Sequence, residues 1–348
     1  PESLPGLSPL RYWAMGSVAA ALLFLSVLLH ELGHCSVALR YQIPIDRITL
    51  FVFGGVAHMR REAPSPRAEI FIAIAGPLVS FGLGILCLGP AVFLESSGSA
   101  PSSRGWVALG TLLGVVNVQL GIFNLLPGLP LDGGRILRAV LWARGRDFHQ
   151  ATKQAASAGL GFGTLFGLAG LLVFVGALMG KVPASSVSGG GWAVLIGVFL
   201  YAAALVSRRQ ATIQQVLATV PVSELMVRTV MSLPPLSTLD QAVNGHFQIY
   251  GYGGFPVVDN GRLVGLVTVR DIHAVPVALW SRRQIQDVMR PATPSLAVEP
   301  EAPVIQAMAQ MAQGGWDRLV VIRNEEIVGL VTQSMIMRFL QRRHGRSQ

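Results

Sequence analysis

The sequence predicts a polytopic α-helical membrane protein followed by a smaller, soluble α/β region. Only 13% of the 348 residues are charged and 51% are hydrophobic, with a mean hydropathy of +0.53, whereas soluble domains average about 25% charged residues. Five apolar stretches approach or exceed the roughly 20 residues that cross a bilayer as a helix. These stretches lie at 12–34, 68–94, 106–126, 155–180 and 191–207. From about residue 210 the long apolar runs stop, and short β-rich runs alternate with helical patterns.

Basic residues divide the connecting loops into two kinds. The loops at 40–67 and 131–153 are rich in arginine, whereas 95–105 and 180–191 are small, polar and nearly uncharged. Because positive loops stay on the cytoplasmic side, we expect 40–67, 131–153 and the region after the last span to be cytoplasmic. This membrane face also accounts for the net charge of +9, since no basic helix with interleaved aromatic residues indicates a nucleic-acid partner.

The predicted topology places residue 1 outside the cell, yet no positively charged export signal precedes the first span. We therefore expect a sixth span before residue 1 in the complete chain. Cys35 and Cys87 each lie in an apolar stretch and offer neither a disulfide framework nor a CxxC metal site. The expectation is a multi-pass protein of a cell membrane, of prokaryotic type.

The first apolar stretch ends in a candidate metal-binding sequence. His30-Glu31-Leu32-Gly33-His34 places two imidazoles four residues apart, hence on one helix face about one turn apart. That spacing suits a tetrahedral Zn²⁺, with the carboxylate of Glu31 in reach of an activated water. Ionisable residues inside a span are costly to bury and are by default functional. We predict a zinc site at His30 and His34 with Glu31 as general base; polar groups snorkelling at a helix end are the alternative.

A catalytic zinc takes three protein ligands and keeps a fourth position open. The residues after His34 lack the downstream histidine of many soluble zinc proteases. Asp132, in NLLPGLPLDGGR (124–135), follows the third apolar stretch on the side where the charge pattern also places His34. Pro127, Pro130 and two glycines let the chain turn and direct a short carboxylate back among the helices. We favour Asp132 as the third ligand, although an aspartate that only caps a turn fits the same sequence.

Three motifs together resemble one known family. HELGH in a span, AGPLVS (75–80) and NLLPGLPLDGG look like the site-2 protease family of intramembrane metalloproteases, in its branch with C-terminal CBS domains. The resemblance covers nearly the whole chain. It implies as functional residues the zinc ligands His30, His34 and Asp132, the general base Glu31, and Asn124 as a hydrogen-bond donor near the scissile carbonyl. That family usually has a further span before the HExxH helix, in agreement with the expected sixth span.

Asn124 has an argument from spacing as well. It lies seven residues, or two helical turns, after Asn117, so both amides share a face that ends at Asp132. Either amide could donate to a developing oxyanion, and either could link two helices. We favour catalysis for Asn124 and helix packing for Asn117. His58 and His149 are predicted to be interfacial residues and not metal ligands.

The segment 46–59 alternates enough to form one or two short strands. Gly54 and Gly55 would permit a turn or a close approach of the backbone. Beside a protease site, an open strand edge could hold an unwound substrate by β-augmentation.

The soluble region contains two copies of one unit, at about 222–273 and 285–340. The matching segments are VSELMVRTVMSLPP with IQDVMRPATPSLAV, and GRLVGLVTVRDI with EEIVGLVTQSMI, at an offset near 63 residues. Two copies of one unit normally bury their faces against each other. This pattern resembles a tandem CBS pair.

In the CBS family a Gly-x-x-Thr-x-x-Asp pattern binds adenosyl nucleotides. The first copy keeps the pattern as Gly265, Thr268 and Asp271, whereas the second has Met335 where the aspartate would stand. The resemblance therefore implies one adenine nucleotide site and not two. A purely structural module that forms a homodimer is the alternative.

The sequence thus predicts a transmembrane zinc metalloprotease domain at 1–209 and a cytoplasmic CBS pair at 210–348. The expected reaction is cleavage of a single-span or other transmembrane protein within or near the bilayer, with the CBS pair regulating or dimerising the enzyme. A CBS-regulated transporter or channel is the rival, but it predicts polar residues along several spans, whereas here they concentrate at a few positions. The intact Glu31 argues against a non-proteolytic relic.

Overall fold

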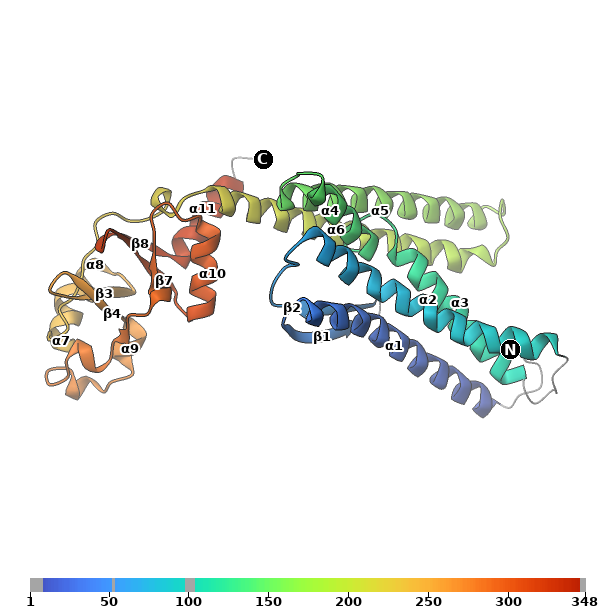
Figure 1. The fold of residues 1–348 in the computed structure, drawn as a ribbon, viewed down its shortest axis with the longest axis horizontal. Helices are drawn as coiled ribbons and strands as arrows, with labels where there is room; N and C mark the ends of the chain where they lie inside the picture. Colours follow the sequence, from blue (N-terminus) through green and yellow to red (C-terminus); the bar gives the residue numbers. More distant parts are fainter. Residues whose placement is uncertain (1–8, 52–53, 98–103, 345–348) are drawn as a thin grey trace. The chain divides into compact units, whose positions relative to one another are not determined.

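A computed structural model describes residues 9–51, 54–97 and 104–344 (Figure 1). The chain forms two compact units that divide between Thr212 and Ile213. The first contains the apolar helices and one small hairpin, and the second contains two small sheets with their helices.

Among the described residues, five helices are long and apolar enough to cross a membrane. They are α1 (Pro9–Arg40), α2 (Pro66–Ser96), α3 (Arg104–Asn124), α5 (Phe148–Leu178) and α6 (Ser186–Thr219). The five predicted spans are confirmed as helices. All five begin before the predicted apolar stretches; α1, α2 and α6 also end beyond them, whereas α3 and α5 end two residues short of the predicted ends. Helical backbone hydrogen bonds continue into polar residues such as Arg40, so a helix can be longer than its apolar stretch.

Helices α1, α2 and α3 pack side by side (Figure 1). Ser65 caps α2 by accepting a hydrogen bond from the Ala68 backbone N–H at 3.2 Å, and Pro66 follows at the first helical position. Asp147 caps α5 in the same way, accepting from the backbone of His149 and Gln150.

The chain turns sharply between α3 and the short helix α4 (Asp132–Ala143). The backbone leaves α3 after Asn124 and re-enters a helix at Asp132, as the prolines and glycines between them predict. The Leu129 N–H donates to the Ala155 carbonyl of α5 at 3.0 Å. A Cβ on Gly159 would lie 1.9 Å from the Leu129 carbonyl oxygen, so only glycine lets this turn sit against α5.

A two-stranded antiparallel hairpin lies beside α1 (Figure 1). It consists of β1 (Ile45–Phe51) and β2 (Gly54–Met59), with Leu50 opposite Gly55. The predicted strands are confirmed. Gly54 and Gly55 belong to β2, while residues 52–53 lie outside the described residues.

The second unit has two three-stranded sheets, ordered β3-β4-β5 and β6-β7-β8. The strands are β3 (Gly254–Asp259), β4 (Arg262–Thr268), β5 (Arg290–Pro291), β6 (Ala297–Val298), β7 (Arg318–Arg323) and β8 (Glu326–Thr332). The helices are α7 (Leu239–Ala242), a π-helical turn (Val243–Phe247), α8 (Gln248–Tyr250), α9 (Val269–His273), α10 (Val304–Gly314) and α11 (Gln333–His344). Single 3₁₀ turns lie at Val222–Glu224, Val277–Leu279, Ile285–Asp287 and Pro294–Leu296.

The predicted repeat is visible as two matching hairpins. The pairs β3-β4 and β7-β8 have the same register and a bulge at the same place. The segment that precedes the hairpin in each copy pairs with a strand of the other copy. Val227 pairs with Leu330 of β8, and Arg290 pairs with Leu266 of β4. Because of this exchange, the two copies fold as one unit.

Candidate active site

The two histidines of α1 are buried and are oriented by α2. The Nδ1–H of His34 donates to the Ile72 carbonyl oxygen at 2.6 Å, and the Nδ1 of His30 is hydrogen-bonded to the Ser80 hydroxyl at 2.8 Å. A carbonyl oxygen can only accept, so Nδ1 of His34 carries the proton and Nε2 presents its lone pair. Such outer contacts are what orient histidine ligands at metal sites.

The free ring nitrogens meet the Asp132 carboxylate. The Nε2 atoms of His30 and His34 lie 3.2 Å apart, and each lies 3.2 Å from Oδ2 of Asp132. A tetrahedral ion with bonds of about 2.0–2.1 Å holds its ligands about 3.3 Å apart. The three donors therefore already have the spacing that one zinc ion requires. In the part of the chain that the structure describes, they are the one group of three His, Cys, Asp or Glu placed to share a metal.

Gly76 of α2 keeps space open beside these donors. A Cβ at this position would lie 2.2 Å from Nε2 of His34 and 2.6 Å from Nε2 of His30. Ordinary van der Waals contact begins near 3.4 Å, so no side chain fits here. A cradle that only glycine leaves free, lined by two nitrogen donors and one carboxylate oxygen, fits a metal ion.

Glu31 stands between the two histidines in the sequence of α1. It is buried as they are, with 8% of its surface exposed. It is close enough to His30, His34 and Asp132 to interact with them electrostatically. Strand β2 covers it: a Cβ on Gly55 would lie 2.5 Å from the Glu31 Cγ. The predicted close approach of the backbone at Gly55 is thus a contact with the predicted general base.

The charge of Asp132 follows from its surroundings. Burial alone would raise the pKa of Asp132, but its close contacts with the two histidine rings and the positive charge of Arg135 lower it by more. The pKa of this carboxyl therefore lies well below its usual range. Asp132 is ionised, which is the state that binds a cation.

The other predicted residues are not among the three metal donors. The Asn117 amide is buried and donates to Ser26 of α1 at 3.1 Å and to the Leu113 carbonyl at 2.8 Å, the helix-linking role that we favoured for it. Asn124 is the half-buried last residue of α3. His58 is exposed on β2 and His149 lies in the first turn of α5, and neither joins the metal donors.

Sequence reasoning did not assign three contacts of this site. The motif AGPLVS was recognised, but not that its Gly76 opens the cradle or that its Ser80 holds His30. The carbonyl of Ile72 had no sequence signal at all, because every residue has one.

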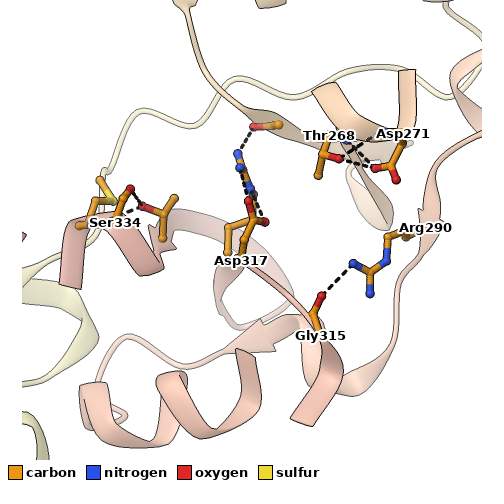
Figure 2. Close-up of polar contacts among 10 residues, drawn as sticks. Thr268, Asp271, Arg290, Gly315, Asp317 and Ser334 are labelled. Atoms are coloured by element: carbon orange, nitrogen blue, oxygen red, sulfur yellow. Dashed lines mark hydrogen bonds and ion pairs between the residues drawn. The ribbon is translucent and has the colours of Figure 1, made fainter. Parts of the chain in front are cut away.

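In the second unit, Thr268 and Asp271 point toward each other (Figure 2). Thr268 caps α9, and the Asp271 carboxylate accepts from the Thr268 hydroxyl at 2.6 Å and from its N–H at 2.9 Å. A Cβ on Gly265 would lie 2.7 Å from the Arg290 carbonyl oxygen, so the absence of a side chain here allows β5 to pack against β4. These contacts give all three residues a structural role, and their binding of a nucleotide stays a prediction.

The second copy forms the corresponding cap without a carboxylate. The Thr332 hydroxyl lies 2.9 Å from that of Ser334 and accepts from the Met335 N–H at 3.3 Å (Figure 2). Between the two caps, Arg318 pairs with Asp317 and donates to the Gly254 carbonyl of the first copy at 3.0 Å. The pKa of Asp317 is held below its usual range, chiefly by the hydrogen bond from Arg318.

Comparisons with known proteins agree with this geometry. The family described as peptidase family M50 matches residues 18–101 and 89–168, and the CBS domain family matches 222–277 and 285–342. Rip3 of Mycobacterium tuberculosis is 32% identical over 342 residues, covering 98% of this chain and 84% of that protein. The chain belongs to peptidase family M50.

Two further relatives of this M50 protease come from distant organisms. The protein sll0528 of Synechocystis is 31% identical, covering 97% of this chain and 86% of that protein. The zinc metalloprotease MJ0392 of Methanocaldococcus jannaschii is 30% identical, covering 96% and 88%. All three relatives carry the words zinc metalloprotease in their names.

The CBS match covers the second unit of the M50 protease. Among solved structures, the CBS domain pair of protein MJ0100, in complex with 5′-methylthioadenosine and S-adenosyl-L-methionine, aligns with 35% of this chain and 99% of that chain. Its identity is 21% and its TM-score 0.31. By its family matches and its relatives, the M50 protease is a zinc metalloprotease with apolar helices and a CBS pair.

Proposed function

We propose that this M50 protease is an intramembrane zinc endopeptidase that cleaves a transmembrane protein within or near the bilayer. The observation that carries the proposal is the buried triangle of His30, His34 and Asp132, set among helices long enough to cross a membrane. A donor set that lies among such helices is open to a substrate that is itself in the membrane.

Different residues of the chain would bind the metal and transfer the proton. His30, His34 and Asp132 hold the metal, which supplies a Lewis acid that polarises the scissile carbonyl and acidifies water when it is bound. Glu31 takes the proton of the attacking water and later passes it to the leaving amine. Burial of Glu31 beneath β2 keeps bulk water from competing for that proton.

Two features support a role in holding the substrate. The hairpin β1-β2 lies over Glu31 through Gly55, so a peptide that pairs with a hairpin edge would pass the general base. A helical substrate must unwind first, because its carbonyls are otherwise hydrogen-bonded within the helix. Asn124, at the end of α3 and eight residues before Asp132, is our candidate donor to the scissile carbonyl.

The second unit is proposed to regulate the first. The arginine-rich loops at 40–67 and 131–153 adjoin the metal site and are expected on the cytoplasmic side. The CBS pair is expected on the same side. The first copy retains Gly265, Thr268 and Asp271, so we expect one adenine nucleotide per chain. Homodimerisation through the CBS pair remains the alternative use of this unit.

The test is Glu31→Gln in the full chain, reconstituted in lipid vesicles with candidate single-span proteins. The amide preserves shape but cannot accept a proton, so we expect wild-type zinc content and cleavage reduced by about 10²–10⁴-fold or more. Glu95→Gln, an exposed carboxylate near the end of α2, is the matched control and should cleave normally. Undiminished cleavage by Glu31→Gln would remove Glu31 from the mechanism.

A further inference from the structure

Arg135 lies between the proposed zinc ligand and a second buried carboxylate. It follows Asp132 by one turn of α4, and its Nη1 lies 4.0 Å from Oδ1 of Asp132. That oxygen is the one turned away from the histidines, which contact Oδ2. On its other side, Nε of Arg135 lies 3.7 Å from Oε1 of Glu69.

Glu69, in the first turn of α2, is 1% exposed and already has a close partner. Arg138 donates directly to its Oε1, and the Arg138 guanidinium lies 4.8 Å from the centre of the Phe148 ring. The two partly buried arginines and the two buried carboxylates, Glu69 and Asp132, balance each other in charge.

The arrangement is asymmetric in a way that suggests a purpose for Arg135. If the arginines served only to neutralise Glu69, Arg138 would suffice, since it makes the direct hydrogen bond. Arg135 stands farther from Glu69 and within reach of Asp132, so its charge is shared between the two carboxylates.

We propose that Arg135 is a positioning residue that holds Oδ1 of Asp132, so that Oδ2 alone is directed at the two histidines. Without it, the short carboxylate could rotate or present both oxygens to the metal. Glu69 in turn keeps Arg135 in place from α2, the helix that also orients both histidines. The inference rests on the proposed function, because it concerns a ligand of the proposed zinc site. Outer-shell partners of metal ligands typically contribute about 10–100-fold to metal affinity.

Arg138 provides the matched control. Arg135→Gln and Arg138→Gln each remove one guanidinium from Glu69, but only the first removes a contact to Asp132. The full chain, purified in detergent, would be titrated with zinc against a chromophoric chelator. Absorption of the Co²⁺-substituted protein would report the coordination geometry, and thermal unfolding would report stability.

We expect Arg135→Gln to bind zinc about 10–100-fold more weakly, with an altered Co²⁺ spectrum. Arg138→Gln should keep its zinc affinity within about threefold while unfolding at a lower temperature. Arg135→Lys should fall between wild type and Arg135→Gln, because lysine keeps the charge but not the planar fork.

Equal zinc affinity in wild type and Arg135→Gln would overturn the inference, and so would an equal loss in Arg138→Gln. If the glutamine variants do not fold, Arg135→Lys and Arg138→Lys decide: the first must bind zinc more weakly than the second. Failure of the proposed function has a different signature. In that case the wild-type chain binds zinc but cleaves no transmembrane protein, and the zinc titrations of the Arg135 and Arg138 variants still decide the inference.

Discussion

Substituting Gly76 by alanine adds one methyl group at the most sensitive point of the metal site. That Cβ would lie 2.2 Å from Nε2 and 2.5 Å from Cε1 of His34, and 2.6 Å from Nε2 of His30. Both rings are fixed on their far sides, by the Ile72 carbonyl and the Ser80 hydroxyl, so neither can retreat without losing a hydrogen bond.

The size of the effect follows from these distances. To restore van der Waals contact, the His34 ring must move by roughly 1 Å, whereas metal sites tolerate deviations of about 0.2 Å. Zinc affinity should therefore fall by more than the 10–100-fold typical of an outer-shell change. Peptide cleavage should fall by at least about 10²-fold, the cost of a 1 Å misplacement in an active site.

Gly82→Ala is the control. Gly82 lies on the same helix, α2, and a Cβ there would meet nothing within 4 Å. In a helix interior alanine is favoured over glycine by about 1 kcal/mol, so neither variant should weaken α2 itself. The assay is zinc content after dialysis against a weak chelator, with cleavage of a single-span substrate in vesicles. Wild-type zinc affinity and turnover in Gly76→Ala would refute the assignment of this cradle to a metal.

Three further outcomes are expected. Asp132→Ala should lose most bound zinc, because one of three ligands is removed; full occupancy by metal analysis would place the third ligand elsewhere. Asp271→Ala in the full chain should weaken binding of an adenine nucleotide, and calorimetry showing no binding of ATP, ADP or AMP to wild type would favour a structural CBS pair. Cysteines introduced at Ser97 and Ser186, in a variant without native cysteines, should react with a membrane-impermeant thiol reagent on intact cells, whereas one at Ser207 should stay protected; the reverse pattern would contradict the predicted sidedness.

Local rules account for what could be predicted. The 3.6-residue period puts His30 and His34 on one face of a helix whatever surrounds it. The apolar runs specify helices because no other open backbone arrangement satisfies its hydrogen bonds in a bilayer. Likewise, the prolines and glycines before Asp132 exclude a continuous helix, and the structure duly begins α4 at that residue.

Tertiary packing decided the rest. His34 and Ile72 are 38 residues apart, His30 and Ser80 are 50 apart, and His30 and Asp132 are 102 apart. No sequence period relates positions so distant, because their contact depends on how α1, α2 and α4 pack.

The glycines show the same division. A glycine in the sequence indicates that the backbone can approach another group closely at that position, but it does not identify that group. Gly76 faces two histidine rings and Gly55 faces Glu31 only because whole helices and a hairpin are docked there. The sequence alone thus determined which residues could bind a metal. The packing of α2 against α1 determined that the free nitrogens of His30 and His34 converge, since each ring is oriented by a hydrogen bond between its Nδ1 and α2.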